Sequence, residues 1–220
     1  TMANMIELGQ VRTGLLVAGE NSRPLLETAI GRLNRMVGIT RRELKPWFSS
    51  LTIGSAAVAV IMSHVDVQPS PLRLLGGAAL SDTRYNHLCE GTADAGMDGE
   101  ATPVMMTDAG QLLQEGVRVA RETWAATKTV LGWSDDSPDV ICTHQVGRRH
   151  SELLYEALGL PRERNVSTVE FMGNCGSASL PATAAYALEK GRLPPGGRMA
   201  LLGIGSGINC LMLGVEHVPS

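Results

Sequence analysis

The sequence predicts an α/β protein in which helices cover the faces of a largely buried sheet. Short apolar segments alternate along the chain with longer segments of helical periodicity. The short segments are apolar throughout, which is typical of strands buried on both faces. Gly is abundant, with 25 of 220 residues, and aromatic residues make up only 4%. This composition suits tight turns and helices packed closely on strands.

The first part of the chain begins with a helical pattern and continues with strands. Residues 1–8 have the apolar spacing of the last turns of a helix, and Gly9 is a suitable stop residue. We therefore expect a segment upstream of Thr1, with a short natural helix as the alternative. The elements that follow are strands at 11–20, 56–62 and 72–80, a short helix with a loop at 24–38, and a loop-rich excursion that extends to residue 107.

The second part is more regular. Thr107 or Asp108 can cap a long helix whose apolar residues lie near one face. The predicted elements are helices at 108–131, 145–158 and 181–189, strands at 139–143, 167–171, 199–203 and 208–215, and Gly-containing turns at 173–177 and 205–207.

Composition excludes several classes of function. The net charge is −3 and the pI is about 5.9, whereas a nucleic-acid-binding surface needs a basic excess. No apolar run approaches the roughly 18 residues of a membrane span. The cysteines show no CxxC spacing and no paired His, so we expect no metal site and reduced thiols in the cytoplasm. They are Cys89, Cys142, Cys175 and Cys210.

Three turns carry the residues best suited to chemistry. His144 ends one predicted strand, Asn174 lies in the turn after the next, and the turn around Gly207 follows the one after that. In open α/β sheets, ligands bind outside the carboxyl ends of strands, so we expect these turns to share one edge. An imidazole, a carboxamide and a backbone N–H at a Gly can all donate hydrogen bonds to the oxyanion or enolate that forms in thioester chemistry.

Simpler interpretations of these residues also exist. A His after a strand is often structural, and an Asn between glycines often only tolerates a positive φ. The turn at 205–207 lacks the Lys of a phosphate-binding P-loop. The basic residues at 148–150 either meet a phosphate or solvate a helix face.

Taken together, three segments resemble the C-terminal half of the ketoacyl synthase III enzymes of the thiolase superfamily. They are 143–147 (THQVG), 173–181 (GNCGSASLP) and 201–209 (LLGIGSGIN). The resemblance covers nearly the whole chain and is weakest over 63–105. Within the family, the chain is most similar to the branch that condenses two long acyl-CoA molecules head to head in olefin and β-lactone pathways. Thr52–Ser55, Gly147 and the run at 205–212 carry that closer similarity.

The resemblance implies a fold and a division into two halves. The fold is thiolase-like, with buried mixed sheets in a layered α/β/α/β/α arrangement that is incomplete at its N-terminus. Residues 1–105 would be the remainder of the N-terminal half, and residues 106–220 would be the C-terminal half.

The resemblance also implies roles for four residues. His144 and Asn174 would bind the thioester carbonyl and stabilise the enolate, and the N–H of Gly207 would complete an oxyanion hole. Arg149 resembles a basic substrate-binding position at the mouth of the coenzyme A channel. The nearby Ser177 and Ser179 would mainly shape their turn.

One departure from the family concerns the nucleophilic cysteine. In the family it lies on the helix whose C-terminal end would be residues 1–8 here, where a helix N-terminus favours a thiolate. No cysteine of this chain occupies that place. Cys175 neighbours Asn174 but belongs to the turn, so we expect the nucleophile to lie upstream.

The implied reaction is a Claisen condensation of two long-chain acyl-CoA thioesters to a β-keto acid, with no metal or redox cofactor. Two alternatives stay open: a decarboxylative 3-oxoacyl-carrier-protein synthase III that uses a malonyl donor, and a non-catalytic subunit of a heterodimeric condensing enzyme. The implied partners are acyl-CoA substrates and a second copy of the chain, with a homologous subunit or downstream pathway enzymes as further options.

Overall fold

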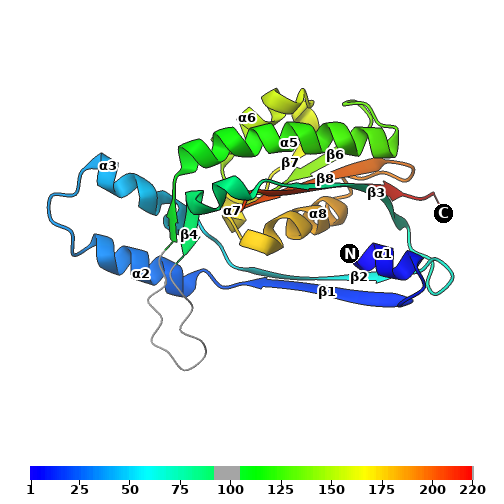
Figure 1. Ribbon diagram of the computed structural model, residues 1–220. Coiled ribbons are helices and arrows are strands. Elements are labelled where there is room, and N and C mark those ends of the chain that lie inside the picture. The colour runs from blue at the N-terminus through cyan, green and yellow to red at the C-terminus, as the bar shows by residue number, and fades with distance from the viewer. Residues whose placement is uncertain (92–104, 220) are drawn as a thin grey trace.

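A five-stranded mixed sheet forms the centre of the protein. The structure, a computed structural model, describes residues 1–91 and 105–219 (Figure 1). The strand order is β3-β9-β8-β6-β7, in which β6, β7 and β8 are parallel and β9 is antiparallel to both of its neighbours. The bounds are β3 Leu72–Ser81, β6 Val140–Thr143, β7 Asn165–Val166, β8 Arg198–Gly205 and β9 Asn209–His217.

Helices cover both faces of this sheet. On one face α5 (Ala109–Leu131) and α6 (Arg148–Leu158) pack over a core that includes Trp124, Ile141 and Leu202. Asp108 caps α5, because its Oδ1 accepts the N–H groups of residues 110 and 111. On the other face α8 (Ser179–Glu189) covers a second cluster of buried residues. The predicted helices are therefore confirmed in their positions relative to a buried sheet.

A second, two-stranded sheet lies beyond α8. It pairs β1 (Thr13–Glu20) with β2 (Ala56–Ser63) in antiparallel register, and α1 (Met2–Glu7) packs on it. Because α8 contacts β2 as well as β6 and β8, it lies between the two sheets (Figure 1). The described residues thus form a helix, sheet, helix, sheet layering, as the predicted fold class requires.

The remaining elements are short. An arm of helices leads from β1 to β2 and extends away from the sheets (Figure 1). It consists of α2 Arg23–Leu33, α3 Arg41–Leu44, η1 Lys45–Trp47 and α4 Phe48–Leu51. The others are η2 Thr83–Leu88, β4 Cys89–Gly91, β5 Met105–Thr107, η3 Arg162–Arg164, α7 Val169–Met172 and η4 Gly176–Ala178. Part of the predicted loop-rich excursion lies outside the described residues.

Two predicted elements differ from the structure. The predicted strand at 167–171 is wrong: the strand is β7, two residues long, and the helical turn α7 follows. The side chain of Gln145 causes this turn, because its Oε1 accepts the N–H groups of Thr168 and Val169 at 3.0 and 3.1 Å. The helix predicted from residue 145 begins only at Arg148, because the backbone of Gly147 before it is extended (φ 167°, ψ 161°).

The two predicted halves are in contact at both sheets. β3, from the predicted first half, forms the edge of the five-stranded sheet through its pairing with β9. An isolated parallel bridge joins Ile53 to Asn174. The division between residues 105 and 106 stays a prediction. In the described part of the chain, no helix is both long enough and apolar enough to cross a membrane.

Candidate active site

His144 lies directly after a strand that is buried along its whole length. The strand pairs Thr143 with Leu202 of β8, and the N–H of His144 continues the pairing by donating to the carbonyl of Leu202 at 3.0 Å. Burial, followed by the charge of the nearby His150, lowers the pKa of His144 to about 4. The imidazole is therefore neutral near pH 7, and its one ring N–H can donate a hydrogen bond.

Asn174 is fixed by both its backbone and its side chain. Its N–H donates to the carbonyl of Thr52 at 3.0 Å, and its carbonyl accepts the N–H of Gly54 at 2.7 Å. Its Oδ1 accepts the N–H of Gly176 at 3.0 Å and the hydroxyl of Ser179 at 3.4 Å. Among the described residues, no acceptor faces the Nδ2 group. The carboxamide is thus held by its oxygen and presents two N–H donors.

Gly207 lies in the turn between β8 and β9. Its φ of +125° is a conformation that L side chains rarely adopt, and a Cβ there would lie 2.5 Å from Nδ2 of Asn209. That Nδ2 donates to the carbonyl of Ser206 at 2.9 Å, and the Oδ1 of Asn209 accepts the hydroxyl of Ser81 at 2.6 Å. The positive φ and the short distance to Asn209 therefore require glycine at position 207. The absence of a Cβ is also expected from the sequence where a backbone N–H must lie close to an oxyanion.

The three turns follow three neighbouring parallel strands. Asn174 comes after β7, His144 after β6 and Gly207 after β8, so all three segments leave the same edge of the sheet. Gln145 ties two of them together, since it binds the start of α7 through Oε1 and the carbonyl of Thr143 through Nε2 at 2.8 Å. The predicted convergence at one edge agrees with this topology.

An open cleft of about 700 Å³ adjoins these segments. His144 and Asn174 do not line it, but their near neighbours Val146 and Gly173 do. The walls come from the end of α4, the start of α6 and α7, and are lined by Leu51, Thr52, Ile53, Val146, Gly147, Arg148, Val169, Glu170, Phe171, Met172 and Gly173.

The basic residue on this cleft is Arg148. The predicted substrate-binding residue, Arg149, lies one position further along α6, where its side chain is 75% exposed and pairs with Glu152 at 3.4 Å. Arg149 is not among the residues that line the cleft. Its role stays a prediction, and the geometry favours Arg148 for contact with a ligand in the cleft.

The cysteines are poorly suited to act as nucleophiles. Burial raises the pKa of Cys142 to about 12 and that of Cys210 to about 11, which disfavours the thiolate. Burial, followed by the charge of Glu20, raises the pKa of Cys175, whose thiol donates to the carbonyl of Met172 at 3.2 Å.

Two residues important to the site, Gln145 and Glu20, could not be assigned their roles from the sequence. Gln145 is 4% exposed, and its Oε1 accepts hydrogen bonds across sequence separations of 22 to 24 residues. Glu20, at the end of β1, accepts both the N–H and the hydroxyl of Ser177 at 3.0 and 2.7 Å. Such long-range contacts depend on the fold, and no local motif announces them.

The chain is similar in sequence to known proteins. Residues 129–215 match the family described as 3-oxoacyl-[acyl-carrier-protein (ACP)] synthase III C terminal. The chain is 37% identical over 219 residues to the acyl-CoA:acyl-CoA alkyltransferase of Shewanella oneidensis, covering 98% of this chain and 62% of that protein. It is 35% identical over 210 residues to the Xanthomonas campestris protein of the same name, covering 96% of this chain and 59% of that one.

A solved structure shows the same fold. Xanthomonas campestris OleA with bound lauric acid and lauroyl-CoA superposes with a TM-score of 0.87 at 34% identity, covering 98% of this chain and 61% of OleA. The chain thus spans about three fifths of the length of the relatives it matches. Residues 129–215 thus match the C-terminal domain of 3-oxoacyl-carrier-protein synthase III, and the described chain has the thiolase-like fold of these relatives and is similar to them over nearly its whole length.

Proposed function

We propose that the full-length protein is an acyltransferase that joins two long-chain acyl-CoA thioesters by Claisen condensation and yields a β-keto acid. The observation that carries the proposal is the pair of donors at one sheet edge: the neutral imidazole of His144 and the free N–H groups of Asn174. The similarity to two acyl-CoA:acyl-CoA alkyltransferases supports it.

Each donor has a place in the reaction. A cysteine thiolate attacks one acyl-CoA and releases coenzyme A, so that an acyl-enzyme forms. A second acyl-CoA loses an α-proton to a general base, and His144 and Asn174 stabilise the resulting enolate oxygen. The enolate carbon attacks the acyl-enzyme carbonyl, whose oxyanion the N–H of Gly207 helps to stabilise, and the thiolate leaves. Hydrolysis of the remaining thioester releases the β-keto acid.

The cleft suits one arm of such a substrate. Phe171, Met172 and Val146 give it apolar walls, and Arg148 is positioned to meet the anionic part of coenzyme A. The nucleophile is proposed to belong to a segment beyond these 220 residues, because three of the four cysteines are buried. The fourth, Cys89, is the first residue of β4, and its sulfur accepts a hydrogen bond from the hydroxyl of Thr107 in β5 at 3.5 Å.

Intact mass spectrometry of the native protein with myristoyl-CoA, followed by peptide mapping, tests the proposal. We expect an acyl adduct on a cysteine outside these 220 residues, and a β-keto acid built from two myristoyl groups. A native mass of 23.3 kDa with no adduct would instead favour a non-catalytic subunit of a heterodimeric enzyme.

A second candidate is decarboxylative condensation with a malonyl-carrier protein. The match of residues 129–215 to a 3-oxoacyl-carrier-protein synthase domain favours it. The same donors would then stabilise the enolate formed by loss of carbon dioxide. Turnover with malonyl-carrier protein and none with two acyl-CoA molecules would establish this candidate over the first.

We further propose that the protein acts in the cytoplasm as a homodimer and needs no metal or redox cofactor. The family resemblance supports the dimer, and the donor set at the sheet edge has no use for a metal. Light scattering of the native protein tests the dimer, and activity after exhaustive chelation tests independence from metal ions.

A further inference from the structure

The turn that carries Gly207 is held by Asp82, at the end of β3. The N–H of Asp82 donates to the carbonyl of Ile208 at 2.8 Å, and the N–H of Ile208 donates to the carbonyl of Asp82 at 2.7 Å. Ile208 is fully buried. Glycine has more backbone freedom than any other residue type, and this turn contains Gly205 and Gly207. Hydrogen bonds from another segment therefore help to keep the turn in one conformation.

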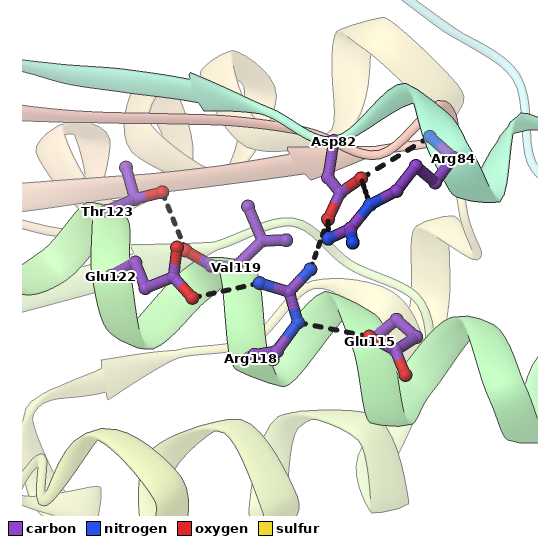
Figure 2. A network of polar contacts seen from close by, with 7 residues as sticks. All are labelled: Asp82, Arg84, Glu115, Arg118, Val119, Glu122 and Thr123. Atoms are coloured by element: carbon purple, nitrogen blue, oxygen red, sulfur yellow. Dashed lines mark hydrogen bonds and ion pairs between the residues drawn. The ribbon is translucent and has the colours of Figure 1, made fainter.

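The carboxylate of Asp82 is in turn gripped by two arginines (Figure 2). Arg84 donates from Nε to Oδ1 at 2.9 Å and from Nη2 to Oδ2 at 2.6 Å. Arg118 donates from Nη2 to the same Oδ2. Hydrogen bonds from Arg84, and then from Arg118, hold the pKa of the Asp82 carboxyl well below its usual range.

Arg118 connects this carboxylate to α5, the longest helix in the described part of the chain. It lies on α5, where its Nε donates to Glu115 at 3.1 Å and its Nη1 to Glu122 at 2.9 Å (Figure 2). The neighbouring Val119, Ala120 and Thr123 are buried, so this stretch of α5 is anchored in the core. An unbroken series of contacts therefore runs from the core helix, through Arg118 and Asp82, to the turn of Gly207.

We propose that Asp82 and Arg118 are positioning residues that fix the Gly207 turn in the conformation needed to receive the oxyanion. This inference rests on the proposed condensation. Neither residue touches substrate; both act through the two backbone hydrogen bonds between Asp82 and Ile208. Because displacement of a catalytic group by about 1 Å can cost on the order of 100-fold in rate, a network that holds this turn affects kcat.

The test uses the full-length native protein with four variants and two readouts. Asp82→Asn and Arg118→Met weaken the ion pair, and Arg118→Lys keeps the charge. Glu122→Gln is a matched control that removes the charge of another partner of Arg118, which binds Nη1 where Asp82 binds Nη2. Hydrogen–deuterium exchange of the peptide containing Ile208 reports on the turn, and steady-state kinetics with myristoyl-CoA report on its consequence.

We expect faster exchange at the turn in Asp82→Asn and Arg118→Met, with kcat lower by about 10- to 100-fold and KM nearly unchanged. Arg118→Lys should recover part of kcat, and Glu122→Gln should match the wild type in both readouts. Unchanged exchange in both weakened variants overturns the inference, as does faster exchange with unchanged kcat. An inactive wild type refutes the proposed function instead, while exchange still decides whether the pair holds the turn.

Discussion

Asn174 uses the two ends of its carboxamide for different purposes. The oxygen accepts hydrogen bonds from its own turn, and the nitrogen has no acceptor among the described residues. Sequence reasoning identified the residue from its Gly-flanked turn. The direction in which the amide points could not be predicted, because it depends on Ser179 and on a turn whose geometry only the folded chain defines.

Replacing Asn174 with Asp separates these purposes. The carboxylate can still accept from Gly176 and Ser179, but it cannot donate to an enolate and repels its charge. We expect kcat to fall by about 100-fold or more, with little change in thermal stability. Cys175→Ser, one position away and more deeply buried, is the control and should keep near-normal kcat. Comparable losses in both variants would show that the turn, and not the donor, is what matters.

The burial of His144 makes a prediction about proton binding. The pKa is lowered from 6.5 in the unfolded chain to about 4 in the fold. Between these values the unfolded state binds the proton first, so stability falls as pH drops through this window and is unaffected above it. Nuclear magnetic resonance of ring-labelled histidine, assigned with His144→Asn, should show a neutral ring from pH 5 to 8. Titration near 6.5 would indicate a solvated ring and weaken its role as a donor.

At the scale of elements, most helices and strands were predictable, and α7 was not. The sequence at 167–171 has short apolar character that suits either a strand or a helical turn. Gln145, distant in sequence, decides in favour of the turn by accepting the N–H groups of Thr168 and Val169. Local pattern cannot reveal a cap provided by another segment.

The same cap predicts the result of Gln145→Leu. The buried N–H of Thr168 and the partly buried N–H of Val169 lose their acceptor. Each loss costs about 1–3 kcal/mol, so the free energy of unfolding should drop by about 2 kcal/mol or more. Urea unfolding measures it. Ser167→Ala, which removes the 3.4 Å contact to the same oxygen and an exposed 2.7 Å contact to Glu170 but leaves both N–H groups bonded, is the control and should change it far less. Equal effects would mean that α7 does not depend on this cap.

At the scale of the whole molecule, the two-stranded sheet exposes an apolar face. Leu15, Val17 and Ile61 point to the same side of the β1–β2 pair and are 60%, 71% and 70% exposed. Two-stranded sheets are marginal unless other elements pack on them. The layered fold class was predictable from apolar strands and alternating helices. The exposed face of the β1–β2 pair could not be predicted from the sequence, because the exposure of a strand depends on how the layers pack in the folded chain.

This face predicts the behaviour of the 220-residue polypeptide produced by itself. It should bind the dye 8-anilinonaphthalene-1-sulfonate and self-associate, because exposed apolar patches favour association. The double variant Val17→Ser with Ile61→Ser should bind less dye. Val130→Ser removes a comparably exposed but isolated apolar residue of α5 and should change little. Equal dye binding by all three proteins would place the apolar patch elsewhere.

The bridge between Ile53 and Asn174 limits how this protein can be recombined. A Cβ on Gly54 would lie 1.8 Å from the carbonyl oxygen of Met172. The segments around Gly54 and Met172 are therefore in direct backbone contact, next to Asn174. Chimeras that join one relative's residues before 92 to another's residues after 104 must match at this contact, even where every reactive residue is retained. Natural or laboratory exchange of the two parts should therefore succeed only between relatives that share the small residue at position 54.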